Sequence, residues 1–119
     1  MSGHVTWMLE LDVHPGSADA FRKLAAEMVV ATQTNEQRTL VYEWSISADE
    51  KTAHLLETYA DSDAGLVHVG NFAAHYMERF LQVVTPTRLT VYGSPSDDLR
   101  DALAPFKPTY MARLDGFVR

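Results

Sequence analysis

Residues 4–13 alternate apolar and polar side chains, and this period of two constrains the fold more than any other feature of the sequence. The apolar positions are Val5, Trp7, Leu9, Leu11 and Val13. Thr6, Glu10 and Asp12 occupy polar positions between them, and Met8 is the one exception. Successive side chains of a strand point to opposite faces of a sheet. The pattern therefore predicts a strand with one buried face and one open face.

A helix is expected directly after this strand. His14-Pro15-Gly16 interrupts the alternation, and Ser17 is a suitable N-cap. Apolar residues then recur at the spacing of one helical face, at Phe21, Leu24, Ala25, Met28 and Val29. The pattern predicts a helix that runs to about Thr32, followed by a polar stretch over residues 33–37.

Two more strands follow as a hairpin. Leu40, Tyr42, Trp44 and Ile46 alternate with Val41, Glu43, Ser45 and Ser47. The short segment 48–51 has the composition of a turn, and residues 52–60 read as the third strand. So short a connection favours antiparallel pairing of the two strands.

The next stretch predicts a second helical region and a fourth strand. Asp61-Ser62-Asp63 supplies cap residues, and Gly70-Asn71 is a candidate break between two helices. The apolar side of a helical wheel holds Leu66, Val69, Ala73, Met77, Phe80 and Val84. We expect Pro86 to end the helix and residues 88–92 to form the strand.

The order βαββαβ predicts an α+β, ferredoxin-like fold, in which both helices cover one face of an antiparallel sheet. Residues 1–93 form this unit. Residues 94–119 are expected to be an extension of the same domain, with a short helix from Ser96 and then an extended arm restricted by Pro105 and Pro108.

The face of the sheet away from the helices must meet water or a partner. Its expected residues mix apolar and polar types: Glu10, Val41, Glu43, Ser45, Leu56 and Thr58. Such a face suits a wet interface between two identical sheets, which predicts a homodimer. A monomer with a solvated sheet is the alternative.

Composition excludes several classes of partner and chemistry. Lys and Arg total 10 against 16 Asp and Glu, and a net charge of −6 disfavours nucleic acid and anionic membranes. No apolar run approaches the roughly 18 residues of a membrane span, and no secretory signal pattern is visible, so we expect a soluble, cytoplasmic protein. The chain has no cysteine, which leaves His, carboxylates, Tyr and Trp to perform any chemistry.

Three segments of the chain carry a family resemblance: Thr39-Leu-Val-Tyr-Glu-Trp44, Leu55-Leu-Glu-Thr-Tyr-Ala-Asp61 and, in the following helix, His68. Together they resemble the antibiotic biosynthesis monooxygenase family of dimeric α+β barrels. The resemblance covers about residues 4–93. It implies a dimer and a ligand cavity within each subunit, between the helices and the sheet. Haem-degrading relatives carry an Asn in the first strand and a Trp-His pair in the second helical stretch. This chain has Leu9 near the first position and no Trp after Trp44.

Aromatic side chains concentrate on the predicted inner face of the sheet. Trp7, Tyr42, Trp44 and Tyr59 form either a flat apolar slot for a polycyclic or quinone-like ligand, or ordinary core packing. Glu57 alternates onto the same face. A carboxylate there must be neutral, hydrogen-bonded or open to a cavity, because burying it unpaired is costly. A structural bond to Arg79 or to a tyrosine hydroxyl is the alternative to a catalytic role.

His68, Phe72 and Arg79 fall close together on the helical wheel and border its apolar sector, whereas His75 points toward solvent. A neutral imidazole accepts a phenolic proton readily near pH 7. A boundary histidine bonded to backbone or water is the alternative. His68 and His75 are seven positions apart, which does not place two metal ligands on one helical face.

Taken with these residues, the resemblance implies a cofactor-independent monooxygenase that oxidises a phenol, a hydroquinone or a polyketide-like aromatic with dioxygen, without flavin or metal. His68 is the expected base, with hydroxyls of Tyr59 and Tyr42 orienting the substrate and Glu57 relaying protons. Trp7, Trp44, Phe72 and Arg79 complete the expected substrate site. The alternative is a non-catalytic dimeric module that binds a small hydrophobic molecule or serves only a structural role.

Overall fold

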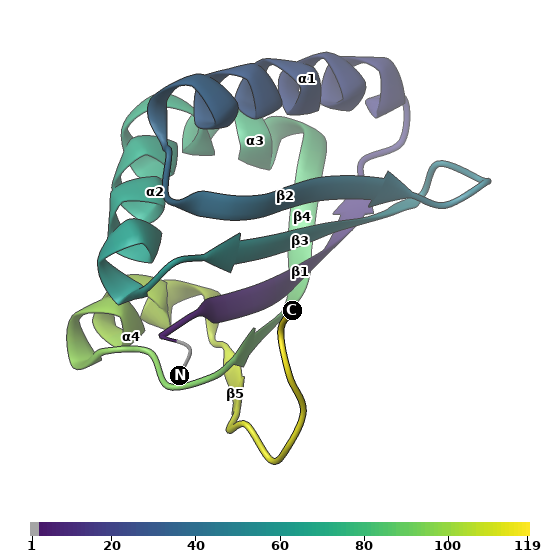
Figure 1. Cartoon of the computed structure of the whole chain (residues 1–119). Coiled ribbons are helices and arrows are strands. Elements are labelled where there is room, and N and C mark those ends of the chain that lie inside the picture. Colours follow the sequence, from purple (N-terminus) through teal and green to yellow (C-terminus); the bar gives the residue numbers. More distant parts are fainter. Residues whose placement is uncertain (1–2) are drawn as a thin grey trace.

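The computed structural model describes residues 3–119 as one sheet with a helical layer packed across it (Figure 1). The sheet has five strands in the order β2-β3-β1-β4-β5. The strands are β1 (Val5–Val13), β2 (Thr39–Ile46), β3 (Thr52–Tyr59), β4 (Val84–Tyr92) and β5 (Thr109–Met111). The helices are α1 (Ala18–Asn35), α2 (Ser62–His75), α3 (Met77–Val83) and α4 (Asp97–Leu103), with the 3₁₀ turn η1 (Ala104–Phe106). This is the predicted α+β, ferredoxin-like arrangement with an added tail.

The predicted alternation of β1 is confirmed, because its odd positions are buried and its even positions lie on the open face. β1 lies between β3 and β4 and pairs antiparallel with both. Its register places Trp7 opposite Glu57 and Leu9 opposite Leu55. The buried face of the sheet packs against Phe21, Leu24 and Met28 of α1 and Phe80 of α3. The apolar spacing of the sequence therefore set which face became the core.

β2 departs from strict alternation at its start. Its register against β3 shifts between Thr39 and Val41, so Leu40 is an extra residue in the strand and is half exposed. The alternation in the sequence places Leu40 on the same face as Tyr42 and Trp44, toward the helices. That prediction is wrong, because the bulge turns Leu40 outward. Beyond the bulge, Tyr42 and Trp44 pack against the core as predicted.

The break in the second helical region falls at Tyr76, and not at Gly70-Asn71. Gly70 lies inside α2, and Tyr76 separates α2 from α3. α3 ends earlier than predicted, because Val84 already has extended backbone (φ −140°, ψ 160°) and begins β4. Pro86 lies within β4, where the pairing with β1 shifts register between Glu10 and Leu11. Such irregular positions tolerate a residue without an N–H.

The tail adds a fifth strand that the sequence did not predict. Ser96 caps α4 by accepting a hydrogen bond from the Leu99 N–H at 3.2 Å, and Leu99 is completely buried. The chain then returns along the sheet edge, where β5 pairs parallel with β4 (Figure 1). Beyond Met111 the arm is exposed, and Leu114 is 98% accessible. Among residues 3–119, no helix is long and apolar enough to cross a membrane.

Candidate active site

Glu57 lies at the centre of a buried polar cluster beneath the helices. It projects from β3 toward the core, and only 2% of the residue is exposed. The Trp7 indole N–H, from the facing position of β1, donates to Oε2 of Glu57 at 2.5 Å. The Tyr59 hydroxyl, two positions along β3, donates to Oε1 at 2.5 Å. Strand geometry thus directs two donors at one carboxylate.

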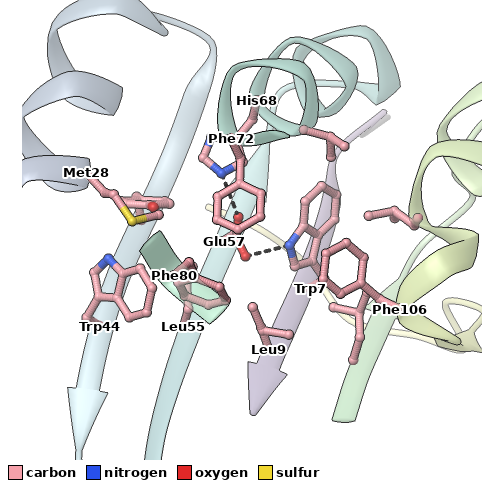
Figure 2. A pocket seen from close by; sticks show the side chains of 14 residues that line it. Trp7, Leu9, Met28, Trp44, Leu55, Glu57, His68, Phe72, Phe80 and Phe106 are labelled. Atoms are coloured by element: carbon pink, nitrogen blue, oxygen red, sulfur yellow. Dashed lines mark hydrogen bonds and ion pairs between the residues drawn. The ribbon is translucent and has the colours of Figure 1, made fainter. Parts of the chain in front are cut away.

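α2 brings His68 to the same carboxylate. The Asp61 side chain caps the helix by accepting from the Ala64 N–H at 3.0 Å, which fixes where the helix begins. His68 is 7% exposed. Its Nε2 lies 3.3 Å from Oε1 of Glu57, and Figure 2 shows the imidazole directed at Glu57 and the Trp7 indole meeting the carboxylate beside it.

A second carboxylate, Glu36, holds the other ring nitrogen of His68. Oε1 of Glu36 lies 2.9 Å from Nδ1 of His68. Asn71 and Thr39 each donate to Glu36 at 3.2 Å, so the contacts tie the end of α1 to β2 and α2. No local sequence pattern marks Glu36 as a site residue, because it stands in a polar loop, 32 positions from His68. A lone carboxylate at a helix end was the only available signal.

The charges of this cluster depend on one another. Burial opposes a charged His68, but the hydrogen bond to Glu36 and the nearby Glu57 charge outweigh it and raise the pKa of the imidazole. Burial also opposes a charged Glu36, yet its bonds from His68, Asn71 and Thr39 hold the carboxyl pKa below its ordinary value. Burial raises the pKa of Glu57. The arrangement favours an imidazolium flanked by two carboxyl groups.

An apolar cavity opens beside this cluster (Figure 2). It is lined by Trp7, Leu9, Met28, Tyr42, Trp44, Leu55, Glu57, His68, Val69, Phe72, Phe80, Leu89, Leu103 and Phe106. We call it the inner cavity. Its volume is about 40 Å³, enough for a few water molecules. A ring-shaped ligand therefore requires some of these side chains to move apart.

A larger and more polar outer cavity lies between α1 and α2. Its volume is about 170 Å³, and Thr32, Asn35, Glu36 and Asn71 contribute to its wall. The two cavities share a group of lining residues: Met28, Tyr42, His68 and Phe72. Movement of a flexible side chain such as Met28 would join the two spaces.

The structure brings together most of the predicted site residues. Trp7, Tyr42, Trp44, Glu57, His68 and Phe72 all line the inner cavity. Tyr59 is fully buried and does not line the inner cavity, but its hydroxyl donates to Glu57, which does. Burial and the Glu57 charge raise the pKa of Tyr59, which keeps its hydroxyl protonated as a donor.

Arg79 lies outside the inner and outer cavities. Its guanidinium is half exposed and pairs with Glu27 of α1, with an Nη2 to Oε2 distance of 2.5 Å. The helical wheel placed it near His68, but the break at Tyr76 changes the direction of the helix before Arg79. Within the described residues, no three His, Asp or Glu side chains are placed to hold a metal ion together.

The chain is similar to known proteins in both sequence and structure. The family model described as antibiotic biosynthesis monooxygenase matches residues 5–81. The structure of MupZ from Pseudomonas fluorescens is similar over 98% of this chain and 94% of its own, with a TM-score of 0.85 and 26% identity. No match was found among curated proteins.

Two further solved structures share the fold. Rv0793 from Mycobacterium tuberculosis aligns over 79% of this chain and 96% of its own, with a TM-score of 0.66 and 26% identity. A mutant of SnoaB from Streptomyces nogalater, described as a cofactor-independent oxygenase, aligns over 80% of this chain and 96% of its own. Its TM-score is 0.65, and its identity of 15% shows likeness of fold alone.

Proposed function

Because the chain belongs to the antibiotic biosynthesis monooxygenase family, we propose that it oxidises a phenol, a hydroquinone or a polyketide-like aromatic with dioxygen, without a cofactor. The observation that carries the proposal is the ring-lined inner cavity bordered by the buried pair of Glu57 and His68. The description of SnoaB as a cofactor-independent oxygenase shows that this fold can support such chemistry.

The proposed reaction needs a proton acceptor and a dry environment. Removal of a phenolic proton gives an electron-rich anion, which transfers electrons to dioxygen. A hydroquinone would become a hydroxyquinone while the second oxygen atom leaves as water, so the substrate supplies all the electrons. The apolar walls of the inner cavity would protect the anion from water.

We propose that Glu57 and His68 act as a unit, with Glu57 as the proton acceptor. A neutral His68 base was the expectation from sequence, but carboxylates at both ring nitrogens favour the charged ring. The raised pKa of Glu57 makes its carboxylate a stronger base than an exposed one. His68 as an imidazolium would stabilise the phenolate, and Trp7 and Tyr59 would hold Glu57 in place.

Oxygen uptake with a panel of hydroquinones tests the proposal. We expect Glu57→Gln and His68→Ala each to lower the rate about 100-fold or more. His14→Ala is the matched control, because His14 lies in the turn between β1 and α1 and lines neither cavity, and it should keep the rate of the unaltered protein. Equal rates for His68→Ala and the unaltered protein would remove His68 from the mechanism.

The apolar lining of the inner cavity also fits a second candidate, a module that binds a hydrophobic molecule without turning it over. A ligand of the folded state raises Tm by mass action. An aromatic that raises Tm while no oxygen is consumed would favour this binding module over the oxidase.

We also propose that the protein is a homodimer joined through the open face of the sheet, and that it works in the cytoplasm. Thr6 and Thr58 are paired on that face through their hydroxyls at 2.9 Å, and both side chains remain partly exposed. A partly apolar, partly polar surface of this kind suits contact with an identical sheet.

A further inference from the structure

Two buried hydrogen-bonding groups of the inner cavity have no protein partner. Within residues 3–119, neither the Tyr42 hydroxyl nor the Trp44 indole N–H makes a hydrogen bond, although both atoms are sealed from solvent. The other tryptophan differs, because Trp7 donates its indole N–H to Glu57 at 2.5 Å. Buried polar atoms are nearly always paired, so these two require an explanation.

The two groups lie near each other on β2. Their rings are 5.9 Å apart between centroids and almost perpendicular. Thr32 and Trp44 are close enough to the Tyr42 hydroxyl to lower its pKa, but neither meets it with hydrogen-bond geometry. Burial outweighs them and raises the pKa of Tyr42, so the hydroxyl stays protonated. Tyr42 and Trp44 therefore offer two donors to whatever occupies the inner cavity.

The position of these donors relative to His68 limits what they can bind. The Tyr42 ring lies 5.3 Å from the His68 ring, and both residues border the inner and outer cavities. The remaining wall around the donors is apolar, with Met28, Phe72 and Phe80. An apolar ring with one oxygen at its edge fits this mixture better than a hydrocarbon or a strongly polar molecule.

We propose that the Tyr42 hydroxyl and the Trp44 indole N–H together bind the carbonyl oxygen of an aromatic ketone, and so select oxygenated aromatics over hydrocarbons of the same shape. This inference rests on the proposed function, since it takes the inner cavity as the substrate site. A site that hydrogen-bonds a ligand oxygen rejects the analogue without it, because the donors are then left unpaired.

Acetophenone and ethylbenzene form a matched pair that differs in the carbonyl group. We expect acetophenone to bind about fivefold to tenfold more tightly, the preference given by one net hydrogen bond. The two indole N–H signals in an ¹H–¹⁵N spectrum report on the site directly. Acetophenone should shift the Trp44 signal further downfield than ethylbenzene does, whereas the Trp7 signal should respond equally to the two ligands, because the Trp7 N–H is already bonded to Glu57.

Tyr42→Phe removes the hydroxyl and keeps the ring. It should abolish most of the preference for acetophenone and leave Tm nearly unchanged, because no protein group loses a partner. Tyr110→Phe is the control, since Tyr110 stacks against Arg100 at 4.2 Å and lines neither cavity. It should keep the preference.

Equal affinity for the two ligands, or a Trp44 signal that does not move, would overturn the inference and show that the donors serve water only. Retention of the preference in Tyr42→Phe would overturn the role of the hydroxyl. The oxidation proposal can be refuted independently of this inference. Ketone binding at Trp44 with no oxygen uptake from any hydroquinone would refute the oxidation and support the binding site.

Discussion

At the scale of single residues, the chemistry of the site depends on where the neighbours of His68 come from. Glu57 lies in β3 and Glu36 directly follows α1, so the His68 imidazole connects these two elements. The free energy of each protonation state is set by the pair of carboxylates together. A substitution of either carboxylate should therefore change the pKa of His68.

Glu36→Gln should lower the pKa of His68, because it removes both the hydrogen-bonded anion and its charge. In the unaltered protein the pKa of His68 is raised above its ordinary value of 6.5. Its contribution to stability is therefore complete below pH 6.5 and is lost as pH rises through the folded-state pKa. The free energy of unfolding should fall over this window by up to about 1.4 kcal/mol per pH unit.

Denaturation curves between pH 5 and 9, together with NMR titration of His68, measure this effect. Glu36→Gln should flatten the decline that begins near pH 6.5, whereas Glu43→Gln, on the open face, should preserve it. Identical pH profiles for Glu36→Gln and the unaltered protein would show that Glu36 does not control the charge of His68.

At the scale of elements, α2 positions the site by packing closely against two neighbours. An added Cβ at Gly65 would lie 3.2 Å from Cδ2 of Leu99 in α4 and 3.5 Å from Cη2 of Trp7. Glycine thus lets α4 and the Trp7 ring approach the helix that carries His68. At Gly70, on the same helix, an added Cβ meets nothing within 4 Å.

Gly70→Ala should stabilise the protein by about 0.5–1 kcal/mol, because alanine loses less conformational entropy than glycine in a helix. Gly65→Ala gives the same gain in helix propensity, but its added methyl group would push the side chain of Leu99 or Trp7 away from α2. Chemical denaturation should therefore find Gly65→Ala less stable than Gly70→Ala by about 1 kcal/mol or more. If both substitutions stabilise equally, the contact between α2 and α4 is loose.

At the scale of the whole molecule, the fold leaves one face of the sheet without a helical cover (Figure 1). Leu56 lies there, paired in register with Met8 on one side and Glu43 on the other. In the proposed dimer, Met8 and Leu56 would be buried against the second sheet, because the centre of an interface is usually apolar.

Leu56→Lys should convert the dimer to a monomer, because it places a charge in the interface. Sedimentation at micromolar concentration should give twice the chain mass of 13.3 kDa for the unaltered protein and the single mass for Leu56→Lys. Leu114→Lys, in the exposed arm, serves as the control and should remain dimeric. A dimer lost only in Leu114→Lys would move the interface from the sheet to the arm.

Local patterns in the sequence predicted most of the fold. The period of two in β1 and β3 and the helical spacing in α1 gave the element order and the buried face, because side-chain direction follows directly from backbone geometry. They also brought Trp7, Tyr42, Trp44 and Glu57 to one face, where the structure places them. The bulge at Leu40, the break at Tyr76 and the pairing of β5 escaped prediction, because each is fixed by contacts with a neighbouring strand or helix.

The contact between His68 and Glu36 was decided only by the tertiary structure. Sequence determined that His68 borders an apolar helix face, but a carboxylate 32 positions away has no local signature that marks it as a partner. The same holds for the unpaired donors of Tyr42 and Trp44, whose isolation depends on what surrounds them. Periodicity specifies the direction of a side chain, whereas protonation and hydrogen bonding depend on distances of a few ångströms between elements that meet only after folding.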